Sequence, residues 1–350
     1  FGNVVGVVGV SGWRTTFGTF GAETLIPDNR ANNVGVYAFE QLESGPWIFS
    51  VGGRFDYRRL DVSPDSGLGV AAQTLSYSSV SGNAGVLYRV APSIALVLNA
   101  GRGFRAPSAF ELFANGVHEG TVAFERGNPA LRNETSVNAD LALRVQSGDL
   151  ALEVGGFANF IQDFIYAVPV PGESDPASGF QVYDITQGDA RLLGFETTLD
   201  YHPTPYLHFH GTADFVRGDN TTTGSPLPDI PPFRATYQLR VEGGRTGRVV
   251  SEPYVSLGAE SHVRQTRLDP AQATFFAQAF DGAGFTPAGY TLLQVGAGFR
   301  LRAGRTPVRF DLTLRNALNQ RYADFLSRIK TNAPDPGMGR ALITRVSADF

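Results

Sequence analysis

The last stretch of the chain, RALITRVSADF at Arg340–Phe350, alternates between two kinds of side chain. Counting back from Phe350 in steps of two gives Ala348, Val346, Thr344 and Leu342. The positions between them carry Asp349, Ser347, Arg345 and Ile343. A period of two predicts a β-strand. Since one face suits an apolar medium, this strand fits either a membrane β-barrel or the edge of a soluble β-sandwich.

The composition is compatible with a membrane protein and shows no footprint of nucleic-acid binding. The 350 residues include 41 glycines, 26 phenylalanines and no cysteine, and 18% are charged, against roughly 25% in typical soluble domains. No run of about 18 apolar residues predicts a transmembrane helix, but membrane β-strands alternate and escape such a search. The net charge of −4 provides no basic surface for nucleic acid.

Alternation of apolar and polar residues recurs along nearly the whole chain and predicts about 14 strands in one domain, residues 1–350. Tilted membrane strands need only about 9–11 residues to cross the hydrocarbon, so these segments are long enough. The predicted strands are Asn3–Arg14, Ala31–Glu43, Trp47–Val62, Ser78–Val90, Ile94–Arg105, Glu134–Gln146, Leu150–Val170, Gln181–Tyr201, Tyr206–Arg217, Phe233–Val241, Val249–Val263, Tyr290–Arg302, Val308–Gln320 and Arg340–Phe350.

The connections between these strands alternate between short turns and long loops. The short turns fall near residues 45, 92, 148, 204, 245 and 305. If the last strand runs towards the periplasm, every short turn is periplasmic and every long loop is extracellular, as in outer-membrane barrels. A soluble sandwich has no reason to sort its loops in this way. The sequence therefore predicts an all-β fold, a transmembrane antiparallel β-barrel.

The longest loop and its flanks, GRGFRAPSAFELFANGVHEGTVAFERGNPALRNE at Gly101–Glu134, resemble TonB-dependent receptors, the active importers of the outer membrane. The matching pieces are Gly103–Ser108, Glu111–Phe113, Asn128–Leu131 with Glu134-Thr135, Leu193–Glu196 and Asn316–Tyr322. Arg132-Asn133 stands where the family usually has Lys-Pro, and little consequence is expected. The terminal Phe350 is similar to the C-terminal phenylalanine that serves outer-membrane barrels as an assembly signal.

This resemblance implies the C-terminal part of a 22-stranded barrel that is filled by an N-terminal plug. The plug, the box that contacts TonB and about eight strands are then expected outside this sequence. The family implies a monomer in the outer membrane of a Gram-negative bacterium, in contact with lipid and with the TonB complex through the missing N-terminal region. It is expected to import a metal ion or a metal chelate (siderophore, haem or zinc), with no enzymatic activity and no intrinsic cofactor.

Two charged residues of the matching segment, Arg105 and Glu111, are candidates for ligand binding. Arg105 is expected at the outer mouth of its strand, where a positive group suits an anionic ligand. The alternative is a structural arginine that orders the loop.

His118 and Glu119 lie in the middle of the same loop and are candidate metal ligands, because imidazole and carboxylate suit zinc- or iron-class ions. Haem receptors carry a histidine between boxes similar to Phe104–Pro107 and Asn128–Leu131, and His118 occupies that interval. The alternative is a solvated loop histidine.

The other histidines give weaker signals. His208 and His210 are two residues apart, so they are expected to share the face that points into the barrel, near its periplasmic end. They fit a polar lining better than a two-histidine metal site. His262 is expected at the outer end of its strand, where it could join a loop site, and His202 falls in a periplasmic turn.

Two other functions fit a barrel. A passive porin-like channel of 14 strands predicts that the first and last strands pair with each other. An outer-membrane protease or lipase predicts a catalytic cluster at one rim, and no Ser-His-Asp order or paired carboxylates support it.

Overall fold

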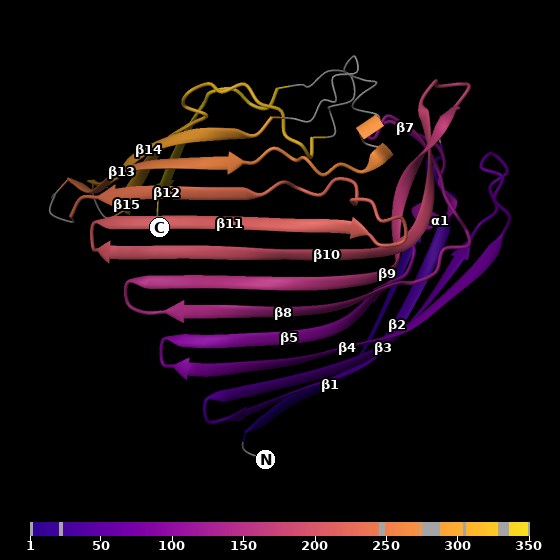
Figure 1. Ribbon diagram of the computed structural model, residues 1–350, viewed down its shortest axis with the longest axis horizontal. Coiled ribbons are helices and arrows are strands. Elements are labelled where there is room, and N and C mark those ends of the chain that lie inside the picture. The colour runs from indigo at the N-terminus through magenta and orange to yellow at the C-terminus, as the bar shows by residue number, and fades with distance from the viewer. Residues whose placement is uncertain are drawn as a thin grey trace.

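The computed structural model describes residues 3–20, 24–244, 249–271, 273–274, 288–303, 306–327 and 336–348. One antiparallel sheet contains all fourteen predicted strands as neighbours in chain order and forms a curved wall (Figure 1). The strands are β1 (Val4–Phe17), β2 (Asn29–Ser44), β3 (Trp47–Val62), β4 (Gln73–Ala91), β5 (Ile94–Arg105), β8 (Glu134–Gln146), β9 (Leu150–Ser174), β10 (Gln181–Thr204), β11 (Leu207–Asn220), β12 (Arg234–Glu242), β13 (Val250–His262), β14 (Tyr290–Ala303), β15 (Thr306–Arg315) and β16 (Ala341–Ala348).

The two ends of the wall differ as predicted. Tight turns gather at one end, on the left of Figure 1, and the long connections gather at the other. We call these the short-turn end and the long-loop end. At the long-loop end β9 and β10 reach 25 and 24 residues, far more than the about 9–11 needed to cross hydrocarbon. The predicted turns near residues 245 and 305 lie wholly or partly outside the described residues, as do Asp349 and Phe350.

The described wall is open. Within the described residues β1 pairs only with β2, and β16 only with β15. The passive-channel alternative predicted a pairing between the first and last strands, and the described residues do not contain it. No helix in the described part of the chain is long and apolar enough to cross a membrane.

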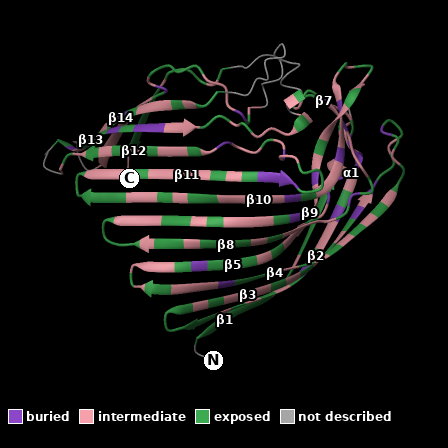
Figure 2. Cartoon of the chain, in the orientation of Figure 1, coloured by how far each residue is buried: buried purple, intermediate pink, exposed green. Residues whose placement is uncertain are grey.

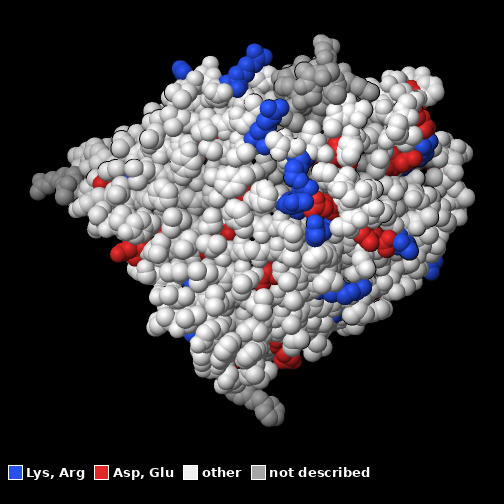
Figure 3. Space-filling view, viewed as in Figure 1, with Lys and Arg blue, Asp and Glu red and all other residues white. Residues whose placement is uncertain are grey.

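The wall has an apolar face and a polar face. Exposure alternates along the strands (Figure 2), and on β8 the exposed apolar residues Val137 and Leu141 alternate with Asn138 and Asp140. Register keeps the faces consistent, because Phe55 on β3 lies opposite Val36 on β2 and both are exposed. Figure 3 shows this convex apolar face, which we call the outer face, with few charged side chains between its two ends. The inner face is the concave, polar one.

The segment predicted as a loop from Ala106 to Asn133 is instead folded, which corrects that prediction. It contains α1 (Ala109–Phe113), β6 (Asn115–His118) and β7 (Ala123–Arg126). Ser108 caps the helix, since its side chain accepts from the Glu111 N–H while the Glu111 side chain accepts from the Ser108 N–H. β6 and β7 form an antiparallel hairpin, and β7 also pairs in parallel with the projecting part of β10. We call residues 106–133 the insert.

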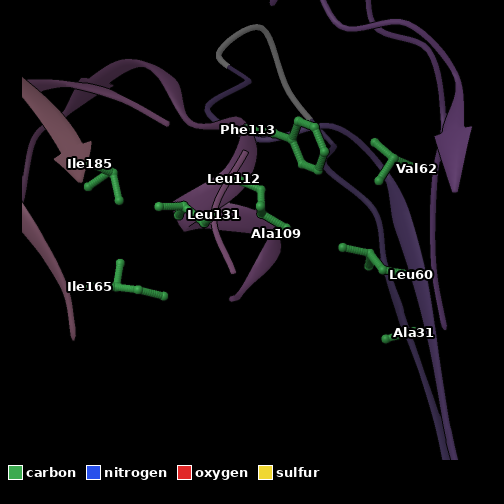
Figure 4. Packing of buried hydrophobic residues seen from close by; sticks show 9 residues of the cluster. All are labelled: Ala31, Leu60, Val62, Ala109, Leu112, Phe113, Leu131, Ile165 and Ile185. Atoms are coloured by element: carbon green, nitrogen blue, oxygen red, sulfur yellow. The ribbon is translucent and has the colours of Figure 1, made fainter. Parts of the chain in front are cut away.

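A buried apolar cluster fixes the insert to the inner face (Figure 4). Leu112 and Phe113 of α1 lie between Leu60 of β3 on one side and Ile165 and Ile185 of β9 and β10 on the other. The remaining members are Ala31, Val62, Ala109 and Leu131. Since β4, β5 and β8 separate these two parts of the wall, the helix bridges the inside of the curve at the long-loop end.

The strand predicted over Val308–Gln320 is shorter in the structure. β15 ends at Arg315 because Asn316 adopts a left-handed backbone (φ 47°). The Asn316 side chain then replaces strand pairing, accepting from the Gln320 N–H at 2.7 Å and donating to the Gln320 carbonyl at 2.9 Å.

Candidate functional site

Arg105 and Glu111, the two predicted ligand-binding residues, form a salt bridge with each other. Arg105 is the last residue of β5 and donates to Glu111 Oε1 at 2.7 Å and to Glu134 Oε2 at 2.9 Å. Glu111 also accepts from the Ser108 N–H at 2.7 Å, and Glu134 accepts from the Ile165 N–H at 3.0 Å. This bridge ties α1 to the ends of β5 and β8, as the structural alternative for Arg105 requires. The sequence interpretation missed Glu134, the register partner of Arg105.

His118 is paired with Glu125 and not with Glu119. It ends β6, and its Nδ1 lies 3.0 Å from Glu125 Oε2 across the hairpin. Glu125 is 7% exposed, and its other oxygen accepts from Thr121 Oγ1 at 2.9 Å. The ring of Phe110 packs edge-on at 5.7 Å. Because the carboxylate holds Nδ1, Nε2 is the ring nitrogen left to contact a ligand.

Glu119, the other predicted metal ligand, lies in the turn of the hairpin. Its side chain is exposed, and its carbonyl accepts from the Val122 N–H at 3.2 Å. In the described part of the chain no group of three or more His, Cys, Asp or Glu side chains is arranged to hold a metal ion. Metal ligation by His118 and Glu119 stays a prediction, and an ion at His118 would need further ligands from its own chelate.

Arg126 anchors the hairpin to the projecting strands. Its Nε donates to Asp184 Oδ1 at 2.6 Å on β10, and its Nη1 donates to Glu173 Oε1 at 2.9 Å on β9. The hydrogen bonds that Arg126 donates to Asp184 and Glu173 raise its pKa above the usual value. The guanidinium is therefore a fixed positive charge that holds the hairpin carrying His118 beside β10.

A row of aromatic rings lies at the long-loop end of β13 and β14. His262 stacks on Tyr290, its register partner, with centroids 4.5 Å apart, and Tyr322 lies 4.5 Å from Tyr290 on the connection to β16. The Tyr290 hydroxyl donates to Asp324 Oδ2 at 2.7 Å. His262 is thus at the outer end of its strand, as predicted. The two tyrosines were not identified as site residues from the sequence.

Tyr322 also lines a recess in the inner face. The recess has a volume of about 460 Å³ and lies across β11 to β15. Its lining includes the polar residues Thr236, Gln238, Glu260, Gln294 and Arg315. The recess therefore places the aromatic ring of Tyr322 beside hydrogen-bonding groups of the inner wall.

The remaining histidines lie at the short-turn end. His210 Nδ1 is 2.7 Å from Asp200 Oδ1, and His208 Nε2 is 3.6 Å from Glu242 Oε2. His202 lies within β10 and not in the turn, and its Nδ1 contacts that of His208. Each of the three has a polar neighbour on the wall, which fits a polar lining.

Known proteins share this fold and part of this sequence. A family model described as TonB dependent receptor-like, beta-barrel, matches residues 2–319. Lactoferrin-binding protein A of Neisseria meningitidis serogroup B is 27% identical over 136 residues, which are 38% of this chain and 14% of that protein.

Two solved structures show the same architecture. The copper transporter OprC superposes with a TM-score of 0.79 at 19% identity, over 99% of this chain and 54% of that one. The FrpB iron transporter from Neisseria meningitidis (F3-3 variant) superposes with a TM-score of 0.69 at 15% identity, over 99% and 52%. The chain therefore spans about half the length of these structures and a smaller part of the curated relative.

The structural likeness, at these low identities, concerns the fold. The family model adds evidence from the sequence itself, since it covers most of the chain, including Gly101–Glu134, Leu193–Glu196 and the first part of Asn316–Tyr322. The chain belongs to the family of TonB-dependent receptor β-barrels.

Proposed function

We propose that this chain is part of a receptor in the outer membrane of a Gram-negative bacterium that binds a metal ion or metal chelate and imports it with energy from the TonB complex. The long-loop end is then extracellular and the short-turn end periplasmic. The receptor acts as a monomer, contacts TonB through a plug region outside this sequence, and carries its metal as cargo without breaking a covalent bond.

The main support for this proposal is the ordered structure of the insert. A loop that only capped a pore would not need a helix packed across the wall, a salt bridge at Arg105 and a hairpin anchored by Arg126. These contacts hold His118 in a fixed position at the end through which a ligand enters. Pre-organisation of this kind lowers the entropic cost of binding.

The site favours a chelate over a bare ion. His118 offers one free nitrogen, and the described residues supply no complete metal cage around it. Tyr290 is stacked against His262 and Tyr322, so the ring of this row that a planar ligand such as haem or a catechol siderophore can contact is Tyr322, which also lines the recess. The copper and iron transporters with this fold and the lactoferrin-binding relative are consistent with metal or iron as cargo.

The test is a titration of the complete receptor, purified in detergent, with copper, zinc, haemin, a ferric siderophore and iron-loaded lactoferrin. Each ligand is measured with the native protein, with His118→Ala, and with His202→Ala as a matched control at the short-turn end. We expect one ligand to bind and His118→Ala to weaken it more than about tenfold, or 1.4 kcal/mol, with His202→Ala unchanged.

Other outcomes are decisive too. If a ligand binds equally well to His118→Ala, the histidine does not contact the ligand, and Tyr322→Ala then tests the aromatic ring of the recess. If no ligand binds and the protein conducts ions in a planar bilayer without TonB, the importer proposal fails and a passive channel replaces it.

A further inference from the structure

Three arginines converge on one carboxylate at the long-loop end of the outer face. Asp219, near the end of β11, accepts from Arg191 Nη2 of β10 at 3.1 Å and from Arg217 Nε at 3.1 Å. Its other oxygen accepts from Arg267, which follows β13 in the chain. We call these four residues the Asp219 cluster. Three positive groups around one negative group leave a net charge of +2.

The carboxylate of Asp219 is buried, whereas the guanidinium groups of the three arginines are partly exposed. Asp219 is 8% exposed, whereas the side chains of Arg191, Arg217 and Arg267 are 39%, 50% and 35% exposed. The buried carboxylate therefore fixes three planar groups side by side and leaves part of each facing outward. Guanidinium groups match the oxygens of phosphate with parallel N–H donors, and this match is their common use in recognition.

The Asp219 cluster adjoins exposed aromatic residues on the same face. Arg191 lies opposite Asp219 on one side and opposite Phe160 on the other, and Phe160 is 53% exposed. Phe215 precedes Arg217 by two positions, so it shares that face, and it is 39% exposed. Figure 3 shows positive and negative side chains at this end of the otherwise mostly uncharged surface. The charged Asp219 cluster therefore borders the apolar part of the outer face.

The arginines of the outer face lie towards its long-loop end. Register and the period of two place further outer-face arginines towards the long-loop end of their strands, at Arg14, Arg30, Arg59 and Arg102. Asp61 lies on the same face and forms a salt bridge with Arg59, so the other three carry the additional positive charge. The short-turn end presents uncharged aromatic side chains instead, among them Trp47, Tyr201 and Tyr206. A ligand of the Asp219 cluster must therefore be anionic and must lie at the extracellular boundary of the apolar band.

We propose that the Asp219 cluster binds the phosphate groups of an anionic glycolipid in the outer leaflet of the membrane. The inference rests on the proposed function only for the membrane location of the chain. The arginines contact the phosphates, and Phe160, Phe195 and Phe215 pack against the acyl chains beneath them. A soluble phosphate would use the arginines but would gain nothing from the aromatic residues.

The test uses the complete receptor in detergent and measures, by native mass spectrometry, binding of phosphorylated lipid A and of its dephosphorylated form. The variant combines Arg191→Gln, Arg217→Gln and Arg267→Gln with Asp219→Asn, so that no buried carboxylate is left unpaired. The control combines Arg144→Gln with Arg234→Gln, which removes the same net charge from the inner face. Circular dichroism and heat-modifiable migration on gels establish that both variants are folded.

We expect the cluster variant to bind phosphorylated lipid A about tenfold more weakly or worse, and the control to bind within about twofold of the native protein. Dephosphorylated lipid A should not distinguish the three proteins. Equal binding by the folded cluster variant overturns the proposal. Competition by millimolar inorganic phosphate overturns the lipid assignment in favour of a soluble anion. Since this readout involves neither metal nor TonB, failure of the import proposal leaves it interpretable.

Discussion

Gly127 donates a backbone hydrogen bond to the carbonyl oxygen of Ala114 at 2.6 Å, which brings the turn after β7 against the end of α1. A Cβ at position 127 would lie 2.6 Å from the Phe113 nitrogen and 2.7 Å from the Leu112 carbonyl carbon. Both are backbone atoms, which cannot move aside as a side chain can. Glycine is required here for space, and the packing of the insert depends on it.

Gly127→Ala should therefore loosen the insert without unfolding the wall. The added methyl group must push the turn away from α1, at a cost of about 1–3 kcal/mol for overpacking. Limited proteolysis should cut within residues 106–133 faster in the variant. Gly148→Ala is the control, because nothing lies within 4 Å of a Cβ built there. Equal cutting of both variants would show that the insert is not held by this contact.

Arg105→Lys should destabilise the insert although it keeps the charge. Arg105 reaches Glu111 and Glu134 at once through two nitrogens, and a lysine ammonium lacks the rigid fork needed for both. The loss of one charge-assisted hydrogen bond predicts about 1–2 kcal/mol, and Arg105→Ala should cost more. The same proteolysis assay measures the effect. Arg144→Lys, at a more exposed ion pair with Glu153, should change little.

Glu125→Gln should weaken binding of a metal chelate, whereas Glu119→Gln should not. Glu125 fixes His118 through Nδ1, and loss of such a carboxylate partner typically costs about 10–100-fold in metal affinity. Glu119 is exposed in the turn. Titration of both variants with the chelate that binds the native receptor separates the two roles. If Glu119→Gln weakens binding more than Glu125→Gln does, the result contradicts this assignment and supports the metal site at His118 and Glu119 that the sequence predicts.

The strands of the wall could be predicted from the sequence because their alternation of apolar and polar residues is a local pattern. A strand with one lipid-facing side must alternate, so β3, β5 and β8 were predicted with their exact bounds. The sorting of connections followed from loop length alone. Exposed apolar residues such as Leu141 would mislead an interpretation as a soluble protein, but the alternation assigns them to the outer face.

The insert could not be predicted in this way. The helix α1 has five residues, too few for a period of 3.6 to be visible. His118 and Glu125 meet because the hairpin of β6 and β7 brings them together. In the sequence Glu119 is adjacent to His118, so it is the more obvious candidate for a second metal ligand. Glu134 could have been found, since it opens β8 and Arg105 closes β5, which makes them partners across adjacent strands.

Asn316→Ala should destabilise the end of β15. The side chain bonds to both backbone groups of Gln320 and donates to the Met338 carbonyl at 3.2 Å, and the residue is 4% exposed. Without it these groups lose their partners, and alanine tolerates the positive φ of 47° less well than asparagine. The expected cost is about 1–3 kcal/mol, measured as a lower temperature of the heat-modifiable transition. Asn316→Asp keeps the acceptor but places a carboxylate against the carbonyl oxygens of Gln320 and Met338 in a buried site, so it should not restore the loss. Native stability of Asn316→Asp would show that the acceptor bond alone holds this turn.

The two faces of β8 predict opposite responses to the same substitution. Leu141 is 56% exposed on the outer face, and Ala142 is its neighbour on the inner face. Leu141→Arg places a charge against lipid, which costs about 2–4 kcal/mol near the middle of a bilayer. Ala142→Arg places it in the polar lumen. We expect the first variant to assemble poorly into vesicles and the second to assemble like the native receptor, judged by the heat-modifiable fraction on gels. Poor assembly of Ala142→Arg alone would reverse the assignment of the faces, and with it the lipid-facing position of the Asp219 cluster.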